Sequence, residues 1–146
     1  MDTERRPQLT TWARWSLFWT LFIGIGAVGG ALGIWIIPDT MGIYLMLPSM
    51  QGLPFAGFFF SGPVWPGVFL LLLNGVTQLG TAALILRRHR LAPYASLACG
   101  LILIGWISLQ FVIFELNPVT TIYGGFALAQ TTMAVAWVRS LRAASH

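Results

Sequence analysis

The chain has 146 residues, of which 57% are hydrophobic and 8% are charged, and its mean hydropathy is +0.78. Soluble domains carry charge on about a quarter of their residues, so this composition excludes a soluble domain and predicts an integral membrane protein. A single cysteine, Cys99, excludes an intrachain disulfide and the paired cysteines of redox or metal sites. The length and the lack of a polar linker predict one transmembrane domain over residues 1–146.

The first predicted element is an apolar helix over residues 15–37. It is too long for the apolar core of a signal peptide, so we expect it to remain in the mature protein. Within this helix glycines recur four residues apart, a spacing that lets another helix approach closely, either inside the bundle or from a second protomer. The predicted packing glycines are Gly26, Gly29, Gly30 and Gly33.

Residues 38–63 form an apolar connection rich in Phe, Met and Leu, with Asp39 as its one charge. Pro48, Pro54 and Pro63 exclude one long helix and predict short pieces joined by turns. Because so apolar a segment cannot simply extend into water, we expect it to lie at the interface, fold over the bundle or dip into it. Two interpretations are open: an outer loop that caps the end of the bundle, and a lid over a cavity for a ligand or lipid.

Three further helices are predicted over residues 64–86, 91–114 and 118–138. The segment RRHR separates the first two, and Asn117 and Pro118 separate the last two, since asparagine caps a helix and proline suits its first turn. A helix of about 20 apolar residues crosses the hydrocarbon of a bilayer. The predicted fold is therefore an all-α membrane protein, a bundle of four transmembrane helices with the apolar segment between the first and second.

The arginines fall in three clusters that are separated from one another by the predicted spans. With four crossings, every cluster lies on the side that holds both termini. Cytoplasmic flanks of spanning helices are enriched in arginine, so both termini are predicted to be cytoplasmic in a multi-pass protein of the bacterial inner membrane. The same clusters explain the pI of about 10.2 without nucleic-acid binding. They consist of Arg5, Arg6, Arg14, Arg87, Arg88, Arg90, Arg139 and Arg142.

Two acids lie outside the N-terminal tail, Asp39 and Glu115, and both fall at the predicted outer boundary. Glu115 stands between the third and fourth helices, where the N-terminus of the fourth helix favours an anion. One interpretation is an interfacial acid at the hinge between these helices. The other is a cation or proton site at the outer mouth, formed by Glu115 together with Asp39.

Amide side chains interrupt the apolar character of the last three spans. They are neutral and both donate and accept hydrogen bonds, so one interpretation is that they join helices to one another. The alternative is that they converge below the outer segment as the polar groups of a small-molecule site, with a tryptophan as an aromatic wall. The predicted ligand-binding residues are Asn74, Gln78, Trp106, Gln110 and Gln130.

The sequence predicts no enzyme, no metal site and no cofactor. His89 lies among arginines and His146 is the last residue, so neither is expected to join metal ligands inside the membrane. The serines lack an adjacent base or a nucleophile-elbow setting, and a paired-carboxylate mechanism requires Asp39 and Glu115 to meet. We therefore predict no catalytic residue.

Four short segments carry a further signal: GG at residues 29–30, PF at residues 54–55, LRR at residues 86–88 and GWISLQ at residues 105–110. Together with a proline near the fourth helix, they resemble a group of small bacterial four-helix integral membrane proteins without an assigned function. The resemblance covers most of the chain, implies four helices and draws attention to Gln110, but it implies no activity. In that group an acid is expected shortly after PF, where this chain has Ala56 and Gly57.

These features predict a small polytopic membrane protein that handles a hydrophobic or neutral small molecule, a lipid or an ion, by binding or transport. We expect a homo-oligomer, because four short helices enclose little volume. One alternative is an accessory or assembly subunit that docks on a larger membrane complex through its glycine groove and apolar outer segment. Another is a membrane-embedded enzyme that acts on a lipid or quinone. The expected partners are the lipid bilayer and either a second copy or another membrane protein, but no nucleic acid.

Overall fold

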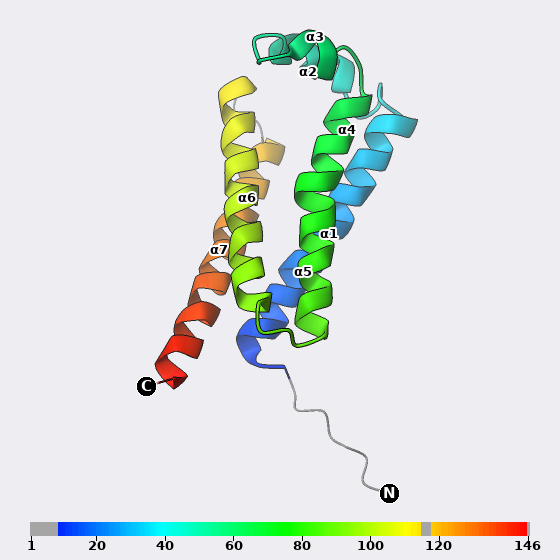
Figure 1. The fold of residues 1–146 in the computed structure, drawn as a ribbon. Helices are drawn as coiled ribbons and strands as arrows, with labels where there is room; N and C mark the ends of the chain where they lie inside the picture. Colours follow the sequence, from blue (N-terminus) through cyan, green and yellow to red (C-terminus); the bar gives the residue numbers. More distant parts are fainter. Residues whose placement is uncertain (1–8, 115–117, 146) are drawn as a thin grey trace, which may run out of the picture.

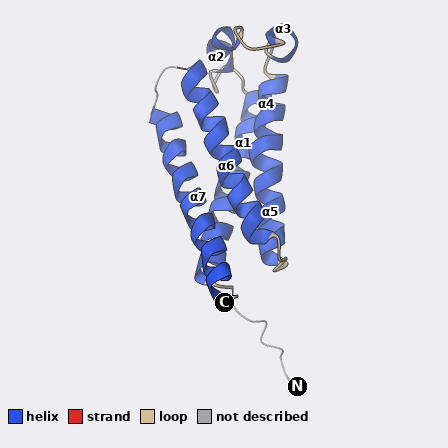
Figure 2. Ribbon diagram, turned by 60° about the vertical axis from the view of Figure 1, so that its left-hand side comes forward, coloured by secondary structure: helices blue, strands red, loops and turns tan. Residues whose placement is uncertain are grey.

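The computed structural model describes residues 9–114 and 118–145, which form an all-α protein. Long helices stand side by side, and two short helices lie across one end of them (Figure 1 and Figure 2). The segments α4, η1 and α5 follow one another directly and make one long helix with a π-helical middle. The elements are α1 (Thr11–Ile36), α2 (Ile43–Met50), α3 (Ala56–Phe59), α4 (Val64–Leu70), η1 (Leu71–Val76), α5 (Thr77–Leu86), α6 (Ala92–Ile113) and α7 (Pro118–Ala144).

Within the described residues, three helices are long and apolar enough to cross a membrane: α1, the helix Val64–Leu86 and α6. Their lengths and compositions are those of a multi-pass membrane protein. The fourth predicted span, α7, is longer than any of them at 27 residues but does not qualify by its apolar content. The physical reason is the polar side chains along α7, which include threonines, a glutamine and two arginines. It nevertheless lies beside α6 along the bundle (Figure 1 and Figure 2).

The ends of α1 follow from local chemistry. The helix begins at Thr11, earlier than the predicted range 15–37, because the Thr10 hydroxyl accepts a hydrogen bond from the Ala13 N–H at 3.3 Å. Such a side-chain bond satisfies one of the free N–H groups of a first turn. At the other end, Ile37 leaves the helical conformation with φ −132°, as expected for the residue before Pro38.

The outer segment, residues 38–63, contains only the short helices α2 and α3, joined by turns. The Gln51 side chain ties this segment together, since its Nε2 donates to the carbonyl oxygens of Leu47 at 3.2 Å and Phe60 at 3.0 Å. Phe59 contacts Trp65 of α4, with ring centroids 5.1 Å apart. These contacts fasten the outer helices to the start of α4, across the end of the bundle (Figure 1).

The two ends of the bundle differ in charge. The start of α1, the turn between α5 and α6 and the end of α7 lie together at the end opposite α2 and α3 (Figure 1). All described arginines belong to this end, which we call the arginine end. Asp39, the one acid among residues 9–114 and 118–145, follows α1 at the other end. The arginines concerned are Arg14, Arg87, Arg88, Arg90, Arg139 and Arg142.

The predicted packing glycines have different surroundings. An atom of a neighbouring side chain lies 3.0 Å from the position that a Cβ would take at Gly30, and another lies 3.0 Å from it at Gly33. Gly29 has no such neighbour within 4 Å, and at Gly26 the nearest atom is a tyrosine hydroxyl at 3.8 Å. Gly30 therefore faces Leu70 of α4, Gly33 faces Met41 in the turn after α1, and Gly29 is exposed.

The closest approach at a glycine is one that the sequence analysis does not predict. At Gly67 in α4 a Cβ would overlap the indole of Trp35, which comes from the end of α1. The Trp35 Nε1–H donates to the carbonyl oxygen of Val64 at 3.0 Å, so the ring is held in this position. Gly67 thus lets the end of α1 pack directly on the first turns of α4.

Candidate functional site

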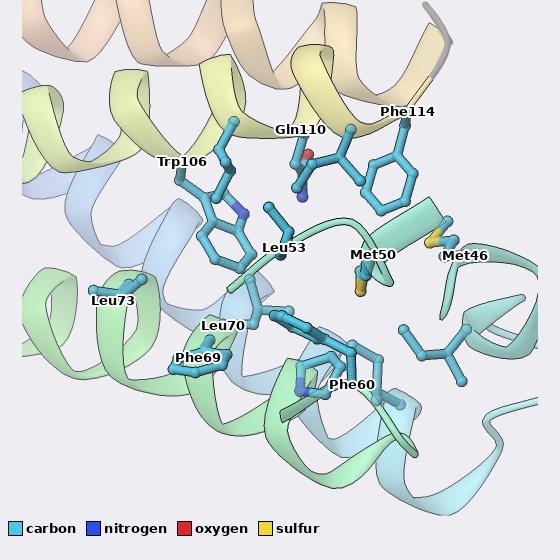
Figure 3. A pocket seen from close by; sticks show the side chains of 15 residues that line it. Met46, Met50, Leu53, Phe60, Phe69, Leu70, Leu73, Trp106, Gln110 and Phe114 are labelled. Carbon is cyan, nitrogen blue, oxygen red and sulfur yellow. The ribbon is translucent and has the colours of Figure 1, made fainter. Parts of the chain in front are cut away.

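A cavity of about 360 Å³, here named the outer cavity, opens between α2, α4 and α6. Its lining is almost entirely aliphatic, aromatic or methionine side chains. Figure 3 shows Trp106 and Gln110 reaching into it from α6, opposite Phe69 and Leu70 of α4. Small-molecule sites typically have volumes of about 300–1,000 Å³, apolar walls and a few polar groups. The outer cavity has these properties.

A second cavity of about 250 Å³, the inner cavity, lies deeper between α1, η1, α6 and α7. Two of its polar lining side chains are Asn74 of η1 and Tyr123 of α7. The two cavities adjoin one another, because several residues line both. The shared residues are Ile34, Ile43, Met46, Leu70, Trp106 and Gln110.

Small residues of α1 provide the room for the inner cavity. Gly26, Ala27 and Gly30 all line it, on the side of α1 that faces Asn74 and Tyr123. A larger side chain at Gly26 would project toward the Tyr123 hydroxyl, 3.8 Å from the position of a Cβ. Two of the glycines predicted to pack helices together therefore also border an open space.

Asn74 is the most unusual polar residue of the site. Its side chain is 1% exposed, and neither its Oδ1 nor its Nδ2 has a hydrogen-bond partner. A buried amide left without partners costs about 1–3 kcal/mol. It lies within η1, and π-helical segments inside longer helices occur frequently at functional sites. Asn74 thus combines a place in the lining of the inner cavity with an amide that has no partner among the described residues.

Gln78 and Gln130 have a different environment. Both are 0% exposed, and they exchange two hydrogen bonds, Gln78 Nε2 to Gln130 Oε1 at 3.0 Å and Gln130 Nε2 to Gln78 Oε1 at 2.7 Å. This pair joins α5 to α7, and neither residue lines the outer or inner cavity. Of the five predicted ligand-binding residues, the structure brings Asn74, Trp106 and Gln110 together at the cavities.

The predicted acids do not form part of this site as described. Asp39 is exposed in the turn after α1 and lines neither cavity. Glu115 lies outside the described residues. Among residues 9–114 and 118–145 no group of three or more His, Cys, Asp or Glu side chains is placed to hold a metal ion. Cys99 is buried in α6, where its Sγ lies 3.1 Å from the Thr81 Oγ1.

Three residues of the site are not among the predicted ones. Tyr123 and the methionines of α2, Met46 and Met50, line the cavities without having been predicted to do so. Nothing in their immediate sequence distinguishes them from interfacial or packing residues. A usable signal for Tyr123 is its position: it lies between one and two turns after the start of α7, at the outer end where Gln110 lies in the last turn of α6.

Comparison with known proteins leaves the family open, since no protein-family model, curated protein or solved structure matches the chain. The resemblance carried by the GWISLQ segment therefore remains an expectation. What the site can do chemically follows from its geometry. The amides and indole carry no charge, so they can exchange hydrogen bonds with carbonyl, hydroxyl or amide groups inside an apolar enclosure.

Proposed function

We propose that this protein binds a neutral amphiphile, with the apolar part of the ligand in the outer cavity and its polar group in the inner cavity. The observation that carries this proposal is the buried, unpartnered Asn74 amide in the lining of the inner cavity, which adjoins the outer cavity of about 360 Å³. Native proteins satisfy nearly all of their buried polar groups, so an amide with two free atoms indicates a partner that comes from outside the chain.

The lining favours a ligand without charge. Neither cavity is lined by a charged side chain among the described residues. Transfer of an ionised group into such surroundings without a counter-charge is strongly unfavourable, whereas a carbonyl, hydroxyl or amide needs only a hydrogen-bond partner. Asn74, Gln110 and Trp106 supply such partners, and the surrounding leucines, isoleucines and phenylalanines suit an alkyl or ring system.

The depth of the cavities favours binding over a continuous path through the bundle. Several residues of the helix Val64–Leu86 line the two cavities, and Asn74 is the last of them along the chain. One turn beyond it, the bonded pair of Gln78 and Gln130 fills the space between α5 and α7. On the helix Val64–Leu86 the lining of the hollow therefore ends before Gln78, and residues of α2 line its other end.

The outer helices suit access from the membrane. Tyr44 and Leu45 on α2 are 49% and 86% exposed, and Met46 is 41% exposed while it lines both cavities. An apolar surface of this kind is expected to lie at the bilayer interface. Methionine side chains are flexible and adapt to ligands of different shape. In this proposal α2 covers the ligand and gives it a route from the lipid.

The proposal includes a membrane arrangement with four crossings, in which α7 is the fourth. The glutamine of α7 is satisfied by its partner on α5, and the Thr131 and Thr132 hydroxyls donate to backbone carbonyl oxygens one turn earlier, at 2.8 Å each. These bonds reduce the penalty for placing polar side chains in lipid. The arginine end then faces the cytoplasm, in accordance with the positive-inside rule.

The test is equilibrium binding of tritiated 1-dodecanol to the protein purified in a maltoside detergent, with dodecanoate as the charged competitor of equal chain length. We expect unlabelled dodecanol to compete and dodecanoate to compete poorly. Asn74→Leu should weaken dodecanol binding about tenfold, because about 1.4 kcal/mol of hydrogen bonding to a buried amide is lost.

Thr132→Val is the control, since Thr132 is exposed on α7 and lines neither cavity. It should leave the affinity unchanged. Equal affinities in the parent, Asn74→Leu and Thr132→Val proteins, or equal competition by dodecanol and dodecanoate, would contradict the proposal.

A further inference from the structure

A third cavity lies at the arginine end, far from the outer and inner cavities, and has a volume of about 300 Å³. We name it the basal cavity. It is enclosed by the start of α1, the turn between α5 and α6, and the end of α7. Four of its lining residues, Ala13, Ile85, Ala92 and Trp137, are buried and form an apolar core cluster. The basal cavity thus has an apolar floor.

Its rim is cationic. Arg88 and Arg90 of the turn line the cavity, with His89 between them. The backbone N–H of Leu91 donates to His89 Nδ1 at 3.2 Å, which leaves the His89 Nε2–H as a donor. The residue that opens α6, Ala92, also lines the cavity, which places the positive end of a helix dipole there. Among the residues that the structure describes, none at this end is acidic.

The backbone of Arg88 gives a second, independent observation. Its φ is 55°, in the left-handed region that glycine adopts easily and other residues rarely adopt. The N–H of Arg88 bonds to the Ile85 carbonyl oxygen at 3.0 Å, and the N–H of His89 bonds to that of Leu84 at 2.9 Å. This is the Schellman pattern at a helix end, where the left-handed position is usually glycine. Arg88 thus lines the cavity from a backbone position that glycine favours.

We propose that the basal cavity binds an anionic phosphate group, with Arg88 as its principal ligand. A guanidinium presents N–H groups in a planar fork that matches two phosphate oxygens, and Arg90 and the His89 Nε2–H add further donors on the same rim. Basic pockets between transmembrane helices at the cytoplasmic surface hold lipid headgroups in this way. The apolar floor suits the glycerol and first acyl carbons of a phospholipid, and a free phosphate would use the rim alone.

The backbone of Arg88 makes a sharp experiment available. Arg88→Gly removes the guanidinium and at the same time places the favoured residue at the left-handed position, so the variant should melt at or above the temperature of the parent. Arg88→Asn serves as a second variant, because asparagine also tolerates this conformation. Arg87→Ala is the charge-matched control, since Arg87 adjoins Arg88 but does not line the cavity.

Native mass spectrometry of the full chain in a non-ionic detergent would compare dioctanoyl phosphatidylglycerol with dioctanoyl phosphatidylcholine. We expect the parent to prefer phosphatidylglycerol, and Arg88→Gly and Arg88→Asn to weaken its binding about tenfold, the factor that about 1.4 kcal/mol of lost charge-assisted hydrogen bonding represents. Arg87→Ala should retain the preference. If added inorganic phosphate displaces the lipid, the site takes free phosphate. If it does not, the phosphate group that the site binds is that of a lipid headgroup.

Two results would overturn the proposal. One is a parent protein that binds both lipids equally. The other is equal weakening by Arg88→Gly and Arg87→Ala, which would mean that the net charge of the arginine end, and no particular site, attracts the anionic lipid. Neither result depends on the ligand of the outer and inner cavities, so this proposal and the proposed function are tested separately.

Discussion

Asn74 and Gln78 lie about one turn apart on the buried side of the same long helix, yet their amides have opposite environments. Gln78 is bonded twice to Gln130, and Asn74 has no partner. The difference depends on the surroundings of each residue: α7 supplies a glutamine opposite Gln78, while Asn74 lies in η1 and lines the inner cavity. Of two chemically similar residues, Gln78 therefore joins two helices, while Asn74 lines a cavity.

Removal of the two amides should have opposite effects on stability. Asn74→Leu should raise the free energy of unfolding of the ligand-free protein, because an apolar side chain of similar size replaces a buried amide without partners. Gln78→Leu should lower it by about 1–3 kcal/mol, since Gln130 is then buried and unpaired. Reversible unfolding in mixed micelles would measure both changes.

The control is the double variant Gln78→Leu with Gln130→Leu, which leaves no unpaired amide and should recover part of the loss. If Asn74→Leu were as destabilising as Gln78→Leu, Asn74 would have a partner within the fold, and the argument for an external ligand would fail.

The sequence shows where these amides lie along the chain, but it does not show which of them form hydrogen bonds with each other. The polar positions are visible because each interrupts an apolar stretch. The bond between Gln78 and Gln130 joins residues 52 positions apart, and no local pattern specifies which amide faces which helix. The same limit applies to Tyr123 and the methionines of α2, which become site residues only when α1, α6 and α7 come together.

At the scale of elements, helix ends are better predicted than helix interiors. Pro38 ends α1 through backbone sterics, which is a local effect, and the predicted break at RRHR falls in the turn between α5 and α6. The predicted end of the last helix at residue 138 is too early, since α7 runs to Ala144. Arginine is a good helix former, so a cationic flank marks the edge of a membrane rather than the end of a helix. The π-helical turn of η1 has no distinctive sequence and is not predicted.

A prediction at this scale concerns the contact of α1 with α4. Gly67→Ala should lower the free energy of unfolding by about 1–3 kcal/mol, because the new methyl group overlaps the Trp35 indole and displaces it from the Val64 carbonyl oxygen. The matched control is Gly29→Ala in α1, where nothing lies within 4 Å of the added Cβ.

Gly29→Ala should be neutral or stabilising by up to about 1 kcal/mol, the difference in helix propensity between the two residues. Thermal unfolding of both variants is the measurement. Destabilisation by Gly29→Ala together with a change in oligomer size would show that this open face of α1 packs on a second protomer. Equal tolerance of both substitutions would mean that Trp35 does not hold α1 on α4.

At the scale of the whole molecule, the two ends of the bundle have different chemistry. The end covered by α2 and α3 is apolar and contains the outer and inner cavities, whereas the arginine end contains the basal cavity. Composition and the spacing of arginines predict this polarity, because both are properties of the sequence itself. The cavities are not predicted by either property, since their volumes depend on how α1, α4, α6 and α7 pack.

The last prediction separates three crossings from four. Three exposed residues suit single cysteine substitutions: Ser49 on α2, Arg87 in the turn after α5 and Ser145 beyond α7. Each substitution would be made in a Cys99→Ala background. If α7 crosses the membrane beside α6, an impermeant maleimide added to intact cells should label the Ser49 site alone. Lysed cells should show labelling at all three sites. Labelling of the Ser145 site together with the Ser49 site in intact cells would mean that α7 does not return to the arginine side. That result would remove the fourth crossing and leave the three apolar helices as the only spans.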